Sequence, residues 1–176
     1  MQHHGVGTRL LDWTDNFAVA LYFALNGKSK PRFSPTIWML NPYKLNDALH
    51  ETNDLFAPEY LGYYQEDEDD EDESEGLYSD YLNNEYDLWW KDPIAIYPIR
   101  RVERLTVQGG YFTIQGRDIR PLDVIVSEKQ KIWAKIVIPE KAVENARMFL
   151  DLVGVNEFTL FPDLDGLARY LNKKYF

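Results

Sequence analysis

Polar side chains that can do chemistry gather at the N-terminus, directly before an apolar segment. They are Gln2, His3, His4, Thr8, Arg9, Asp12, Trp13 and Thr14. A histidine or glutamine can supply a base or hydrogen-bond donors, and an arginine guanidinium matches the geometry of a phosphate. A tryptophan ring can stack on a flat base. The segment therefore has the groups that a nucleotide site needs.

An architectural interpretation of the same segment stays open. Arg9 and Asp12 carry opposite charges and can form a partly buried ion pair that fixes the loop before the apolar segment. Thr14 can cap the helix that follows. The residue types alone do not choose between a nucleotide site and a structural tie.

A second candidate site is the stretch from Arg101 to Phe112, which contains Gln108 followed by two glycines. Glycines let the main chain approach a ligand or another strand closely, and Gln108 can present its carboxamide there. A bulge at the start of a strand explains the glycines equally well.

The pattern of apolar and turn residues predicts the helices and strands that must position these residues. Together they predict an α+β fold, a single domain with a mixed sheet of several short strands and helices packed on it. A helix is expected from Phe17 to Leu25, capped by Thr14 or Asp15 and ended by Asn26 and Gly27. It is apolar nearly all round, which predicts that most of its surface is buried at the centre of the fold. Strands are expected at 36–40, 93–98, 111–115, 122–126 and 132–138, and further helices near 45–49, from 139 to 153 and at 164–171. Residues 78–90 are rich in aromatic side chains and fit either an amphipathic helix or a loop.

The charge of the chain is concentrated in one segment. Of its 29 acidic residues, nine lie within residues 66–75, which leaves 20 against 19 Lys and Arg. A run of like charges buries nothing and is typical of a disordered insertion, here at about 65–76. It can also be an acidic arm that docks on a basic partner and deters binding to nucleic acid.

Composition excludes several classes of site. The chain has no cysteine and three histidines, so disulfides and thiolate chemistry are excluded and no metal is expected. No run of about 20 apolar residues and no secretion signal is visible, so we expect a cytoplasmic protein that does not enter a membrane. One domain over residues 1–176 is expected from the length.

Two runs near the N-terminus carry a family resemblance. Residues 2–14 read Q-H-H-G-V-G-T-R-L-L-D-W-T, and residues 20–24 read A-L-Y-F-A. They resemble the Q-H-x-G-x-P-T-R-L-L-D-W-T and A-L-Y-F-A signature of the FRG domain, a family of bacterial and phage proteins. Similar landmarks follow at 38–42, at 104–112 (the family's R-x-x-x-Q-x-G-x-F) and at 160–168, which reads L-F-P-D-L-D-G-L-A. The resemblance therefore extends over most of the chain.

The chain departs from the family pattern at two places. Gly7 stands where the family usually has proline, which loosens the turn before Thr8. Family members usually begin earlier, with a strand that carries the Arg-Gly motif. We therefore expect a natural short form, a missed upstream start, or a strand supplied by another chain.

The resemblance implies a function related to ADP-ribosyltransferases, with NAD as the cofactor and a role in conflict between bacteria and phages, as in antiphage defence. It implies catalytic roles for His3 and Gln108, although a glutamine is a poor replacement for the glutamate that such enzymes usually carry. It places Gln2, Thr8, Arg9, Asp12 and Trp13 on the wall of the cofactor site. The competing hypothesis is a noncatalytic FRG domain that binds a protein partner through its surface or acidic arm. Nothing in the sequence points to nucleic acid binding or to an oligomeric state.

Overall fold

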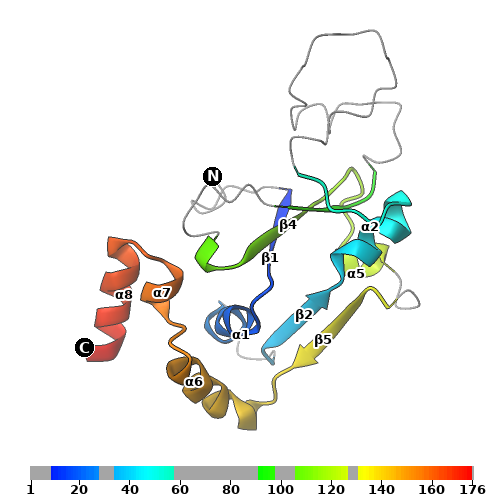
Figure 1. Cartoon of the computed structure of the whole chain (residues 1–176). Coiled ribbons are helices and arrows are strands. Elements are labelled where there is room, and N and C mark those ends of the chain that lie inside the picture. Colours follow the sequence, from blue (N-terminus) through cyan, green and yellow to red (C-terminus); the bar gives the residue numbers. More distant parts are fainter. Residues whose placement is uncertain (1–8, 28–33, 58–90, 98–105, 127–130, 176) are drawn as a thin grey trace, which may run out of the picture. The chain divides into compact units, whose positions relative to one another are not determined.

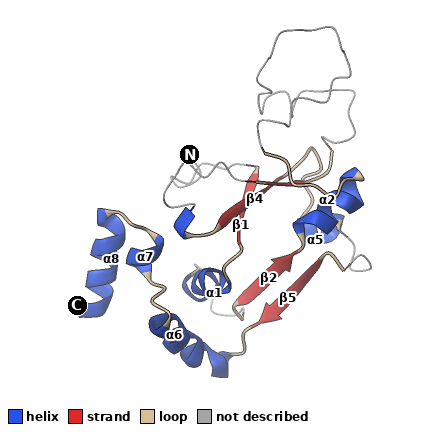
Figure 2. Ribbon diagram, viewed as in Figure 1, coloured by secondary structure: helices blue, strands red, loops and turns tan. Residues whose placement is uncertain are grey.

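The computed structural model describes residues 9–27, 34–57, 91–97, 106–126 and 131–175. The acidic insertion at about 65–76 and the aromatic segment at 78–90 lie outside these residues, as do Gln2, His3, His4 and Thr8. The described chain contains helices and short strands that form two small sheets, which confirms the α+β class (Figures 1 and 2). The strands form a three-stranded sheet in the order β1-β4-β3 and a two-stranded sheet of β2 and β5.

The bounds of the elements agree with most of the sequence predictions. The strands are β1 (Leu10–Thr14), β2 (Thr36–Leu40), β3 (Ile94–Ile96), β4 (Gly110–Ile114) and β5 (Trp133–Val137). The helices are α1 (Phe17–Asn26), α2 (Pro42–His50), α5 (Leu122–Ile125), the 3-10 turn η5 (Glu140–Ala142), α6 (Val143–Leu152), α7 (Glu157–Leu160) and α8 (Leu164–Tyr175).

The chain forms two compact units, each made of three segments that are distant in the sequence. Of the described residues, the first unit contains 9–12, 40–57, 91–97, 112–126 and 131–133, and the second contains 13–27, 34–39, 106–111 and 134–175. Neither unit is a continuous length of chain, so each is held together by contacts between residues that are far apart in the sequence.

Two small clusters of apolar side chains lie on opposite faces of β3 in the first unit. Strand β3 pairs antiparallel with β4. Successive side chains of a strand point to opposite faces. Ile94 and Ile96 accordingly pack with Ile114, whereas Ala95 packs with Leu45 of α2 and with Val126 and Ile132.

Asn46 ties α2 to β3 in the interior of this unit. Its side chain is 0% exposed. The amide Nδ2 donates to the carbonyls of Asp54 (2.7 Å) and Ala95 (2.9 Å), and Oδ1 accepts from the amide of Ala95 (2.9 Å). A buried polar side chain needs such partners, because an unpaired one costs free energy.

The core of the second unit is built on α1. Val19, Leu21 and Tyr22 of α1 pack with residues from a strand, a loop and two other helices. These are Ile37, Ile138, Leu150 and Leu160. The predicted burial of α1 holds for Val19, Leu21 and Tyr22 and for the residues packed against this core, whereas Phe17 is 53% and Phe23 is 42% exposed.

The cap of α1 also differs from the prediction. Asn16 is the N-cap residue, and its Oδ1 accepts from the amides of Ala18 (2.9 Å) and Val19 (3.4 Å). Thr14 and Asp15, which were expected to cap the helix, stand before it. The helix ends at Gly27 as predicted, where the Gly27 amide donates to the carbonyl of Phe23 (2.9 Å).

Two local predictions are corrected by the structure, and one helix was not predicted. The predicted strand at 122–126 is the short helix α5, because Pro121 precedes it and accepts from the amides of Val124 (2.9 Å) and Ile125 (3.1 Å). The predicted loop before α1 contains strand β1. Helix α7 was not predicted; Asn156 and Thr159 form its capping box, with threonine where the usual sequence signature has Glu or Gln.

Candidate functional site

Arg9, Asp12, Trp13 and Gln108 are the predicted site residues that the structure describes. The first two belong to the first unit, and the last two belong to the second.

The side chain of Arg9 is exposed and makes one hydrogen bond to the main chain. Its Nη1 donates to the carbonyl of Gly116 (2.6 Å), and its own carbonyl accepts from the amide of Gln115 (2.8 Å). Arg9 is therefore tied to the turn that follows β4. An exposed guanidinium held in this way keeps a defined position and remains accessible to an anion.

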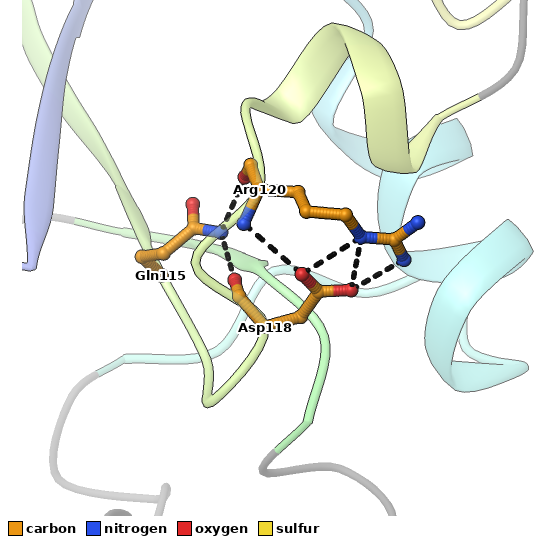
Figure 3. A network of polar contacts seen from close by, with 3 residues as sticks. All are labelled: Gln115, Asp118 and Arg120. Carbon is orange, nitrogen blue, oxygen red and sulfur yellow. Dashed lines mark hydrogen bonds and ion pairs between the residues drawn. The ribbon is translucent and has the colours of Figure 1, made fainter.

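The turn that Arg9 contacts is fixed by an internal network (Figure 3). The side-chain amide of Gln115 donates to the carbonyls of Asp118 and of Arg120, the second at 3.1 Å. The Asp118 amide donates to the carbonyl of Lys91 (2.9 Å), which ties the turn to the chain before β3. These hydrogen bonds hold an exposed turn in one conformation.

Asp118 and Arg120 form an ion pair in this turn. The Arg120 Nε lies 3.0 Å from both carboxylate oxygens of Asp118, and its Nη2 lies 2.5 Å from one of them. The side-chain hydrogen bond from Arg120 is the main reason that the pKa of Asp118 falls to about 2. Asp118 is therefore ionised at any physiological pH, and its charge is balanced by Arg120.

In the second unit, Thr14, Gln108 and Leu160 form a chain of hydrogen bonds. The Thr14 hydroxyl donates to the carbonyl of Gln108 (2.6 Å) and accepts from the amide of Asn16 (3.1 Å). The Gln108 side-chain amide donates to the carbonyl of Leu160 (2.9 Å). Three segments that are distant in the sequence are thus joined through the half-buried Gln108.

Gly109 shows why a glycine follows Gln108. Its φ is +56°, a left-handed conformation that L side chains rarely adopt, and a Cβ there would collide with the carboxylate of Asp15. The Asp15 amide donates to the Gly109 carbonyl (3.1 Å). In the second unit, the glycine therefore allows the main chain at position 109 to lie close to the residue that follows β1.

A buried tyrosine lies beside these contacts. Tyr22 of α1 is 6% exposed. Burial is the main cause that raises its pKa to about 12, followed by the charge of Glu157 and a hydrogen bond to it. Burial alone would raise the pKa of Glu157, but hydrogen bonds, including one from Lys173 at 2.9 Å, bring that pKa below its usual value. The contact joins α1 to α7 and α8.

Aromatic contacts link the same elements. The rings of Phe23 and Phe161 meet edge to face with centroids 6.2 Å apart, and the guanidinium of Arg169 lies 5.2 Å from the Phe161 ring centroid. Residues within 20–24, 108–111 and 160–168, which lie in segments that resemble family landmarks, therefore all contribute contacts within the second unit.

The described residues contain no group of three His, Cys, Asp or Glu side chains that could hold a metal ion. In the same part of the chain, no helix is both long enough and apolar enough to cross a membrane.

Comparison with known proteins identifies one family. The model of the FRG domain matches residues 1–32, which confirms the resemblance over this stretch. The matched range overlaps the described residues at 9–27, that is, at Arg9, β1 and α1. No curated protein and no solved structure matches the chain.

Proposed function

We propose that this chain is an FRG-domain protein that binds NAD or a related nucleotide and acts on it as an ADP-ribosyltransferase-like effector in conflict between bacteria and phages. The match of the FRG domain to residues 1–32 carries the proposal, because that stretch holds the polar side chains that a nucleotide site needs. In this reading the protein acts in the cytoplasm.

Arg9 is the residue that the geometry supports best for such a role. Its guanidinium donates once to Gly116 and is exposed, so it can bind a phosphate oxygen without reorganising. Trp13, which is half-buried in β1, stays a predicted member of the site on the sequence alone. His3, Gln2, Thr8 and Asp12 remain predicted members of the site, and their roles rest on the sequence.

The test is incubation of the full chain with isotopically labelled NAD, followed by mass spectrometry for transferred ADP-ribose and released nicotinamide. We expect turnover that falls in Arg9→Lys, which keeps the charge but loses the planar fork that matches a phosphate. Arg147→Lys is the matched control, because Arg147 is exposed on α6 and is not a predicted site residue. Turnover that is equal in both variants would remove Arg9 from the site.

A noncatalytic binding protein is the second candidate, and one observation favours it. The side chains of Gln108 and Arg9 both donate hydrogen bonds to main-chain carbonyls, and such hydrogen bonds stabilise the fold. In this reading the FRG signature builds a scaffold, and a protein partner binds its surface or its acidic arm. A folded chain that does not turn over NAD, and that loses its partner when residues 66–75 are deleted, would support this candidate over the enzyme.

A further inference from the structure

Helix α6 has a second apolar face beside the one that joins the core of its unit. Leu150 is buried, and Val143 and Ala146 pack with it against the core of the second unit. With 3.6 residues per turn, the apolar side chains at the end of the helix lie outside that face. They are Met148 (57% exposed), Phe149 (40%), Leu152 (85%) and Val153 (48%). The core therefore covers only part of the apolar surface of α6.

These four side chains form one patch, which we call the α6 patch. Met148 and Leu152 are four positions apart, as are Phe149 and Val153. Residues four apart on a helix are neighbours on its surface, so the patch consists of two adjacent columns. An exposed apolar patch with polar groups at its edge marks an interaction surface.

The size of the α6 patch indicates how strong an interaction it can support. From the exposed fractions of its side chains, the patch has an area of roughly 400 Å². Two such patches bury roughly 800 Å² of apolar surface, and apolar atoms make up about 65% of a homodimer interface. The whole contact is then about 1,200 Å², the lower end of the range for specific complexes. This area suits a weak, reversible pair of chains.

The charged side chains beside the α6 patch have an order that complements itself. Glu144, Arg147 and Asp151 are exposed on the side of α6 next to Met148 and Leu152. In an antiparallel pair of helices, a two-fold axis through the patch places Arg147 of one copy within about one turn of Asp151 of the other. The same contact then occurs twice. Glu144 lies nearer the start of the helix, beyond the patch.

The net charge of the chain opposes such a pair only at long range. Each copy carries a formal charge of -10, from 29 acidic and 19 basic residues, and this count includes the nine acids within 66–75. At 0.15 M salt, exposed charges that are further apart than about 8 Å are largely screened. The apolar contacts between two α6 patches do not depend on charge.

We propose that the α6 patch joins two copies of this chain, with their α6 helices antiparallel across a two-fold axis. A second copy fits because it supplies an equal apolar patch and a carboxylate opposite Arg147. The inference goes beyond the proposed function and does not depend on it, because α6 holds none of the predicted site residues.

The experiment is sedimentation velocity of the full chain at 0.15 M salt, from roughly 1 to 500 µM, a range that brackets a weak affinity. We expect the wild type to shift from monomer to dimer within this range. Leu152→Glu buries an unpaired charge in the contact, so it should weaken dimerisation at least tenfold. Leu164→Glu on α8 is the matched control, because Leu164 is 83% exposed and the change adds the same charge. Thermal unfolding checks that both variants are folded.

A charge exchange tests the antiparallel arrangement. Arg147→Asp and Asp151→Arg each place like charges opposite one another, so each alone should weaken dimerisation by about fivefold or more. The double variant restores opposite charges at both contacts and should dimerise within about twofold of the wild type. Arg147→Lys keeps the charge and should dimerise as the wild type does.

Each outcome decides for or against the proposal. A wild type that stays monomeric over the whole range refutes it. If Leu152→Glu dimerises at least as strongly as Leu164→Glu, the contact does not lie on α6. If the double variant is as weak as the single ones, the antiparallel pairing is wrong. Loss in Leu152→Glu alone, together with recovery in the double variant, supports the proposal.

Discussion

Replacement of Gln108 by glutamate distinguishes a structural residue from a catalytic one. The Gln108 side-chain amide donates to the carbonyl of Leu160 (2.9 Å) from a half-buried position. A glutamate at pH 7 has no donor and would place a carboxylate against that carbonyl. Loss of the donor leaves a partly buried carbonyl unpaired, which costs about 1–3 kcal/mol, and repulsion adds to it. We therefore expect a destabilisation of about 2–3 kcal/mol or more.

The assay is urea unfolding followed by tryptophan fluorescence. With a slope of roughly 2 kcal/mol per molar urea, the expected loss lowers the midpoint by about 1 M or more. The new carboxyl should have a raised pKa in the folded state, so the lost stability returns as the pH falls and the protonated form donates again. Gln108→Leu is the control, because it lacks the donor but carries no charge and should show no recovery at low pH. An unchanged midpoint for Gln108→Glu, or a gain in NAD turnover, would refute the structural role.

Three further predictions follow from the described contacts. Gly109→Ala should destabilise the chain by about 1–3 kcal/mol, because φ is +56° and the new Cβ meets Asp15; thermal unfolding measures this, and an unchanged melting temperature would contradict it. The fold favours the neutral form of Tyr22, so the contribution of Tyr22 to the free energy of unfolding is fully present below pH 10 and is lost as the pH rises towards about 12. In urea unfolding between pH 9 and 12, Tyr22→Phe should lose less stability than the wild type. An equal loss in both proteins would refute this prediction. Asn46→Ala should lower the free energy of unfolding by about 3 kcal/mol or more, because it leaves buried main-chain groups of Ala95 unpaired. A loss below about 1 kcal/mol in urea unfolding would show that the hydrogen bonds between Asn46 and Ala95 contribute little to stability.

Periodicity and turn residues predicted most of the elements. Apolar runs predicted β2 and β5, because their signal lies in β-branched and aromatic residues within a few positions. Helical spacing predicted α6 and α8, and Gly27 predicted the end of α1. The same signals were misleading for α5, where β-branched residues favoured a strand but Pro121 starts a helix. Strand β1 was missed because its polar residues are typical of a loop.

The sequence by itself determined the α+β class, the family resemblance and the list of polar residues at Arg9, Asp12, Trp13 and Gln108. Only the tertiary structure decided what these side chains contact. Thr14 and Gln108 are separated by 94 positions, Gln108 and Leu160 by 52, and Arg9 and Gly116 by 107. No local pattern encodes such pairs, because propensity and periodicity report on neighbours within one or two turns of the chain. The acceptors are main-chain carbonyls, which every residue carries, so only the folded path of the chain selects the three that are used.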